Sequence, residues 1–126
     1  MNIRKVDHLV LTTANSKDIL AFYQTIGFKI HDKGYRYEAC LDDFKINIHE
    51  AGRELQPNAF HAQPGTLDVC FEIEGDIASW RKQLVQKGYQ PTEILMKDGA
   101  KGNMYSFYVC DPDLNLIEFC SYDNGL

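Results

Sequence analysis

The sequence predicts an α+β fold in which two βαβββ modules form a cupped, mainly antiparallel sheet with helices on its outer face. Three observations predict it: most apolar runs are short and β-rich, two amphipathic segments have helical spacing, and these segments occupy matching places in the two halves. Neither half alone can cover a curved sheet, so we expect the modules to pair and leave the inner face for a ligand.

The first module opens with a strand-like run at 6–12 (VDHLVLT), after which Asn15 stands where a helix N-cap is expected. Apolar residues then recur at three- and four-residue spacing, and Gly27 follows where a left-handed C-terminal cap is favoured. Three β-like stretches complete this module: 28–32, 35–41 and 44–50.

The second module repeats this order. A strand-like run at 67–73 (LDVCFEI) precedes Gly75 and Asp76 as a cap, an apolar stripe that includes Trp80, and a stop at Gly88. The β-like stretches that follow are 89–94, 104–110 and 114–120.

We therefore expect one domain over 1–126, with module 1 at about 3–50, a connecting arm at 51–66 and module 2 at about 67–122. A chain of 126 residues is long enough to bury roughly two-thirds of its unfolded surface. The arm contains Gly and Pro and lacks periodicity, and loops of that length are often functional, so we expect it to act as a lid.

Composition and charge disfavour several classes of binding partner. A net charge of −5 disfavours a nucleic-acid binder, and no apolar run approaches the ~20 residues of a membrane span. The N-terminus lacks the apolar core of a signal peptide, so we expect a cytoplasmic protein. The four cysteines form no CxxC pair, which indicates free buried thiols rather than a zinc ribbon or a redox pair.

Strand alternation places several polar side chains on the predicted inner face. They are His8, Asn47, His49, Asp68 and Glu118. His49 follows Asp42 by seven residues, as Glu118 follows Asp111, and this predicts that His49 and Glu118 occupy equivalent positions.

A metal site is the functional interpretation of these residues. Imidazole and carboxylate ligands suit Zn²⁺, Ni²⁺, Fe²⁺ or Mn²⁺, and the expected ligands are His8, His49, Glu118 and Asp68. Glu118 stands in the apolar run LNLIEFC, where an unpaired carboxylate is costly to bury, so a cation or a hydrogen-bond partner must accompany it. The alternatives are hydrogen-bonded core histidines and an Asp68 that accepts only backbone amides.

Three further residues are candidates for binding a substrate. Lys101 lies in the small-residue loop GAKG, which suits either an anion or a plain hairpin connection. His61 lies in the connecting arm, where it can reach a substrate or have no role, and Asn47 lies on the inner face.

Four segments carry a resemblance to a known family: VDHLVLT, FYQTIGF, PGTLDVCFEI and DPDLNLIEF. With them the chain resembles the vicinal oxygen chelate superfamily of glyoxalases, bleomycin-resistance proteins and extradiol dioxygenases. The stretches KINIHEAGRE, PNAFHAQPGTLD and GAKG resemble the glyoxalase-domain-containing protein 5 group within it.

The resemblance implies a homodimer with a metal inside the sheet, and His8 and Glu118 match the family's first and last ligands. Two positions depart from the pattern. Asp68 stands where many metal-binding relatives carry His, which makes extradiol cleavage less favoured. Asn47 stands where the glyoxalase I branch has a Glu ligand, so His49 is expected to replace it.

The main functional prediction is a glyoxalase-like, metal-dependent enzyme of the lyase or isomerase type. Its substrate is expected to be a small oxygenated molecule such as a thiol adduct of an α-keto aldehyde, with Glu118 doubling as the catalytic base. The alternatives are a binding or sequestering protein of the bleomycin-resistance type and, second, a dioxygenase.

Overall fold

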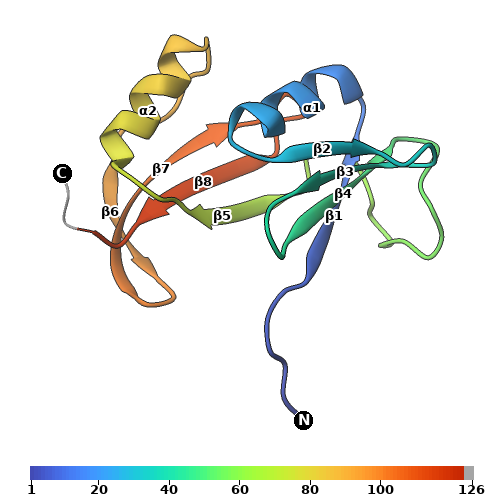
Figure 1. Ribbon diagram of the computed structural model, residues 1–126, viewed down its shortest axis with the longest axis horizontal. Coiled ribbons are helices and arrows are strands. Elements are labelled where there is room, and N and C mark those ends of the chain that lie inside the picture. Colours follow the sequence, from blue (N-terminus) through green and yellow to red (C-terminus); the bar gives the residue numbers. More distant parts are fainter. Residues whose placement is uncertain (124–126) are drawn as a thin grey trace. The chain divides into compact units, whose positions relative to one another are not determined.

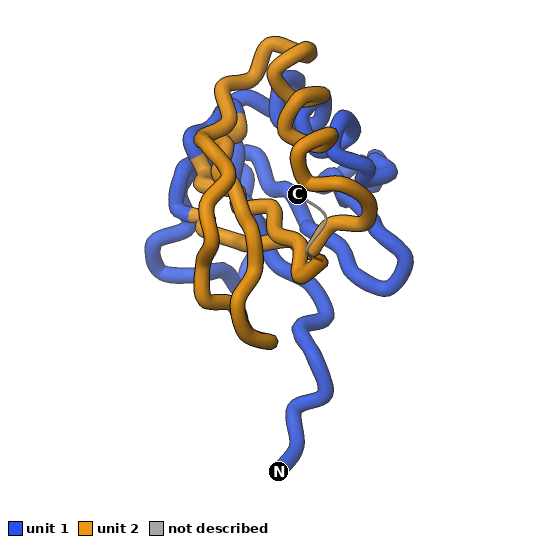
Figure 2. The backbone as a smooth tube through the Cα atoms, turned by 90° about the vertical axis from the view of Figure 1, so that its left-hand side faces the viewer, with its two compact units in different colours: residues 1–66, 112–114 blue, residues 67–111, 115–126 orange. Residues whose placement is uncertain are grey.

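Two runs of strands along the chain each fold into a separate four-stranded sheet. The computed structural model describes residues 1–123, and Figure 1 shows their strands and helices. The chain divides into two compact units, coloured separately in Figure 2. Unit 1 comprises Met1–Thr66 with Pro112–Leu114, and unit 2 comprises Leu67–Asp111 with the segment from Asn115 onward.

Both units have the predicted βαβββ order. Unit 1 contains β1 (His8–Thr13), α1 (Ser16–Thr25), β2 (Lys29–Asp32), β3 (Tyr37–Cys40) and β4 (Lys45–Glu50). Unit 2 contains β5 (Asp68–Glu72), α2 (Ile77–Gln86), β6 (Leu95–Gly99), β7 (Gly102–Cys110) and β8 (Leu116–Ser121). The sheet orders are β1-β4-β3-β2 and β5-β8-β7-β6, and in each the first pair is parallel and the other two are antiparallel. The α+β class and the mainly antiparallel pairing are therefore confirmed.

The helix of each unit covers one side of that unit's sheet. In unit 1, α1 lies against β2 and β3 with Ile19, Phe22 and Tyr23 fully buried. In unit 2, α2 lies against β7 and β8, and the Trp80 ring centroid is 5.4 Å from that of Phe119. Successive residues of a strand point to opposite sides of the sheet. The strand side chains that alternate with the helix-facing ones therefore point away from the helix.

The helix caps follow the predicted residues with one difference. Asp76 accepts a hydrogen bond from the Ser79 amide at 2.9 Å, as an N-cap should. Asn15 occupies the N-cap position of α1, but its side-chain amide donates to Asp18 at 2.8 Å and makes no cap bond. Gly27 has a φ of +113°, the left-handed conformation expected of the residue that ends α1.

The strand predicted at 89–94 is wrong, because β6 begins only at Leu95. Pro91 has no amide hydrogen for a ladder, and the Arg81 side chain donates to the Thr92 carbonyl at 2.7 Å. Thr92 is joined to β7 by two hydrogen bonds with Tyr108: its backbone amide donates to the Tyr108 carbonyl, and its hydroxyl accepts from the Tyr108 amide. Within residues 1–123 no helix is long and apolar enough to cross a membrane.

Candidate functional site

The polar face of unit 1, defined here by Thr12, Glu38, Asn47 and His49, has two distinct ends. In the parallel pairing of β1 with β4, His8 lies opposite Lys45 and His49 lies opposite Thr12. Four residues of strand, about 13 Å, therefore separate the positions of the two histidines. Metal ligands sit about 2.0–2.3 Å from their ion, so this separation does not favour a single metal bound by both His8 and His49, and their pairing as ligands stays a prediction.

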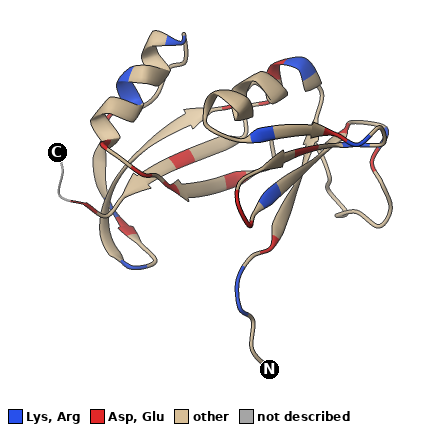
Figure 3. Ribbon diagram, in the orientation of Figure 1, with Lys and Arg blue, Asp and Glu red and all other residues tan. Residues whose placement is uncertain are grey.

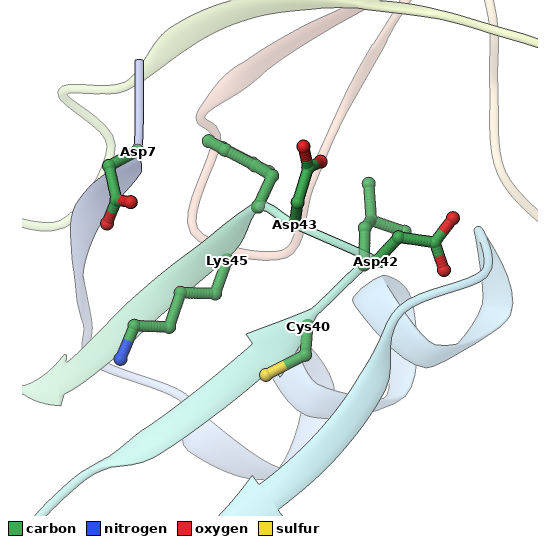
Figure 4. Close-up of a pocket in the computed structure, with 7 residues that line it drawn as sticks. Asp7, Cys40, Asp42, Asp43 and Lys45 are labelled. Atoms are coloured by element: carbon green, nitrogen blue, oxygen red, sulfur yellow. The ribbon is translucent and has the colours of Figure 1, made fainter. Parts of the chain in front are cut away.

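At the His8 end is a shallow hollow of about 290 Å³ (Figure 4). Asp42 and Asp43 line it from the turn after β3, and Lys45 lines it from β4. His8 itself is 43% exposed at its side chain, and its Nδ1 lies 2.8 Å from the Asp7 carboxylate. That hydrogen bond from His8 lowers the pKa of Asp7.

At the His49 end is a cavity of about 430 Å³ beneath the connecting arm. The sheet contributes Val10, Thr12 and His49, and the arm contributes residues that include Pro57, His61 and Thr66. All of the lining belongs to unit 1. The structure thus places His49 and His61, two residues predicted on separate grounds, around one cavity.

His49 is 6% exposed, and neither of its ring nitrogens has a hydrogen-bond partner among the described residues. Burial, and then the positive charge of Arg36, lower the pKa of His49. The ring is therefore neutral at pH 7, with one nitrogen able to donate a hydrogen bond and the other able to accept one. Buried polar groups are normally paired, so this ring indicates a missing partner.

An ion-pair network occupies the middle of the same face. The Glu38 carboxylate accepts hydrogen bonds from Arg36 at 2.6 Å and from Lys45 at 3.0 Å. The Arg36 bond is the main reason that the pKa of Glu38 is lowered. Asn47 lies opposite Glu38, and its Oδ1 is buried without a partner among residues 1–123. The sequence analysis missed this network, although alternation along 35–41 places Arg36 and Glu38 on one face.

Unit 2 also has a polar face, defined here by Asp68, Cys70, Tyr108 and Glu118. Glu118 is the one charged residue of β8, which carries a single acidic band in Figure 3. Cys70 of β5 and Tyr108 of β7 lie directly opposite Glu118 on either side. The Oε2 atom of Glu118 is buried and has no hydrogen-bond partner in the described part of the chain.

The neighbours of Glu118 are held in their neutral forms. Burial, with the charge of Glu118 and a hydrogen bond to it, raises the pKa of Tyr108. Cys70 is an exposed residue, contrary to the predicted buried thiols. Partial burial of its thiol, followed by a hydrogen bond to Cys120, raises the pKa of that thiol. Because a thiol reacts and binds metals as the thiolate, Cys70 is poorly suited to be a nucleophile or a ligand. The Tyr108 hydroxyl remains a hydrogen-bond donor that can orient the carboxylate.

The strand register corrects the predicted equivalence of His49 and Glu118. His8 pairs with Lys45 in unit 1, and Asp68 pairs with Leu116 in unit 2. Asn47 lies two residues after Lys45, and Glu118 lies two residues after Leu116. Asn47 is therefore the residue that corresponds to Glu118. His49 corresponds instead to Cys120.

The structure gives the two remaining candidates different roles. Asp68 is exposed at the start of β5, and its negative charge contributes to raising the pKa of Tyr108. Lys101 lies in a tight hairpin between β6 and β7, and its amine contacts the Glu72 carboxylate at 2.7 Å. The same amine lies 4.6 Å from the Tyr122 ring centroid. The Lys101 amine thus contacts neighbours within unit 2, and its role in substrate binding stays a prediction.

Comparisons with known proteins indicate the family of this chain. The model of the glyoxalase/bleomycin resistance protein/dioxygenase superfamily matches residues 5–119. The glyoxalase domain-containing protein RDO1 of Mycosarcoma maydis is 39% identical over 127 residues, covering 99% of this chain and 72% of that protein. The solved structure of virulence protein STM3117 from Salmonella typhimurium is 34% identical, with a TM-score of 0.93 over 98% of this chain and 100% of that one.

A more distant structure shares the fold alone. Lactoylglutathione lyase from Agrobacterium tumefaciens is 15% identical, with a TM-score of 0.73 and 96% coverage of both chains. The family model matches residues from both βαβββ units, and Asn47 and Glu118 lie within the match. The chain therefore belongs to the glyoxalase/bleomycin resistance protein/dioxygenase superfamily, also called the vicinal oxygen chelate superfamily.

Proposed function

We propose that the chain is an enzyme that moves a proton within a small oxygenated substrate, with Glu118 as its acid–base group. The observation that carries this proposal is the buried, unpartnered Oε2 of Glu118 beside Tyr108 and Cys70. A buried carboxylate oxygen costs free energy unless a hydrogen-bond donor or a cation contacts it. A substrate proton at this oxygen supplies the missing contact.

The substrate class that we propose is a thiol adduct of an α-keto aldehyde, which carries a hydroxyl carbon next to a carbonyl. Glu118 takes the proton from the hydroxyl-bearing carbon, and the electron pair moves onto the neighbouring carbonyl oxygen. That proton returns to the former carbonyl carbon, and the hydroxyl proton of the first carbon passes to the new oxyanion. The product is the thioester of a 2-hydroxy acid, an isomer of the substrate, so no other reactant is consumed. Tyr108 is a positioning residue, because its hydrogen bond orients the carboxylate.

Members of this superfamily often use a divalent metal, and the residues present were compared with that requirement. Within residues 1–123 no group of three His, Cys, Asp or Glu side chains is placed to hold an ion. On the polar face of unit 2, Asp68 and Glu118 are two carboxylates, whereas catalytic zinc sites have three protein ligands. Asn47 stands where unit 1 would offer a carboxylate. This donor set does not fit such a site, and no step is assigned to a metal.

A second function, binding or sequestering a small molecule without chemistry, is favoured by the arm-covered cavity of unit 1. Its volume of about 430 Å³ lies within the range of ligand pockets, roughly 300–1,000 Å³. A bound but unaltered ligand distinguishes this function from the first. Turnover is thus the observable that separates the two.

The test supplies purified protein with the hemithioacetal of methylglyoxal and glutathione. Chelated protein and samples reloaded with zinc, nickel, iron or manganese are compared, and metal per chain is measured by elemental analysis. We expect thioester formation already in the chelated sample, because no step is assigned to a metal. Binding of the hemithioacetal without product in every sample would replace the enzyme by the sequestering protein.

We also propose a homodimer in the cytoplasm. The four cysteines are free thiols, which is typical of a reducing compartment. Each unit's four-stranded sheet ends in two edge strands, and such edges are commonly covered in proteins. Light scattering at micromolar concentration is expected to give twice the mass of the 14.4 kDa chain, and a monomer there would contradict the dimer.

A further inference from the structure

We infer that the arm-covered cavity of unit 1 binds a small uncharged molecule that presents a hydroxyl or carbonyl oxygen to His49. The inference rests on the second function proposed above, whose ligand class it names, and on unit 1 alone, so it holds whether or not Glu118 performs chemistry. Three properties of the cavity lead to it: its size, its lack of charge, and the unpaired ring of His49.

Size sets the scale of the ligand. A volume of about 430 Å³ corresponds to roughly 14 water molecules at ~30 Å³ each, which suits a molecule of one or two rings. Val10 and Pro57 supply apolar wall, so bulk water is a poor filling for the whole space. A partly apolar molecule of that size fits better.

The lining sets the charge of the ligand. Among the described residues that line the cavity, none is Asp, Glu, Lys or Arg. Two charges outside the lining act on His49, and both have partners: Arg36 is paired with Glu38, and the Glu54 carboxylate accepts a hydrogen bond from the Gly52 amide. An ionised ligand would lose its hydration without gaining a counter-charge, so an uncharged one is favoured.

His49 sets the functional group. Its side chain lines the cavity, the residue is only 6% exposed, and neither ring nitrogen has a hydrogen-bond partner within residues 1–123. A neutral imidazole offers one donor and one acceptor, which match a hydroxyl or a carbonyl oxygen. Thr12 and His61 lie in the same lining and offer further polar contacts from the sheet and the arm.

Phenol is the probe, with toluene as the matched molecule without oxygen and benzoate as the charged one. Backbone amide resonances of ¹⁵N-labelled protein are followed at millimolar probe. We expect phenol to shift resonances of 57–66 and of β1 and β4, and to bind more tightly than toluene or benzoate. Absence of phenol-dependent shifts at the cavity, or equal binding of benzoate, would overturn the inference.

Variants separate the His49 contact from general packing. His49→Leu is expected to weaken phenol binding roughly fivefold or more and leave toluene binding unchanged, because one buried hydrogen bond is lost. His31→Leu is the matched control on exposed β2 outside the cavity, and it should bind phenol as the wild type does. If His49→Leu fails to fold, His49→Gln and Thr12→Val provide the comparison. Wild-type phenol affinity in a folded His49 variant would refute the contact.

Discussion

Glu118→Gln is expected to reduce turnover of the hemithioacetal by at least about 100-fold, the usual contribution of a general acid–base group. The amide has nearly the shape of the carboxylate but accepts no proton. The free energy of unfolding is expected to stay within about 1 kcal/mol of the wild type or to rise, because Oε2 has no partner in the described residues to lose. Steady-state kinetics and chemical denaturation check both expectations.

The matched control is Glu74→Gln, which makes the same change at an exposed turn of unit 2. It should leave turnover and stability unchanged. If Glu118→Gln instead loses several kcal/mol of stability, the carboxylate is structural and its assignment as the acid–base group fails. The unpartnered oxygen makes that outcome the less expected one.

Asn115→Ala is expected to lower the free energy of unfolding by about 2–4 kcal/mol. Asn115 is 1% exposed and Asp111 is 2% exposed. The Asn115 amide donates to the Asp111 carboxylate at 2.8 Å, and its carbonyl oxygen accepts from the Leu67 amide at 2.8 Å. Alanine removes both bonds and deprives a buried carboxylate of a donor.

The measurement is urea denaturation followed by circular dichroism. Asn103→Ala is the control, because Asn103 is exposed at the start of β7. We expect the control to change the free energy of unfolding by less than about 0.5 kcal/mol. Equal stabilities of the two variants would show that the hydrogen bonds of Asn115 do not stabilise the segments that precede β5 and β8.

The βαβββ order was predictable because its signals are local. Period-two alternation, capping residues such as Asp76, and left-handed positions such as Gly27 each act within a few residues. The strand predicted at 89–94 failed because Pro91 breaks a ladder and Arg81 bonds to the backbone from another element. A tertiary contact of that kind is not visible in the local pattern.

The candidate site was predicted in part for a similar reason. Alternation placed Glu118 and Asn47 on polar faces, and the structure does the same. The equivalence of His49 with Glu118 came from counting along the chain, whereas register depends on hydrogen bonds between strands distant in sequence. The cavity shared by His49 and His61 depends on the path of the long arm, which no periodic signal determines.

The most direct test of Glu118 as the acid–base group is to add a small carboxylate to Glu118→Ala and to measure whether turnover returns. The variant removes the carboxylate and leaves space beside Tyr108 and Cys70 for formate. We predict a turnover that is at least about 100-fold below wild type without formate and that rises with formate concentration until it saturates. Wild-type turnover by Glu118→Ala in the absence of any added carboxylate would contradict the proposed role of Glu118.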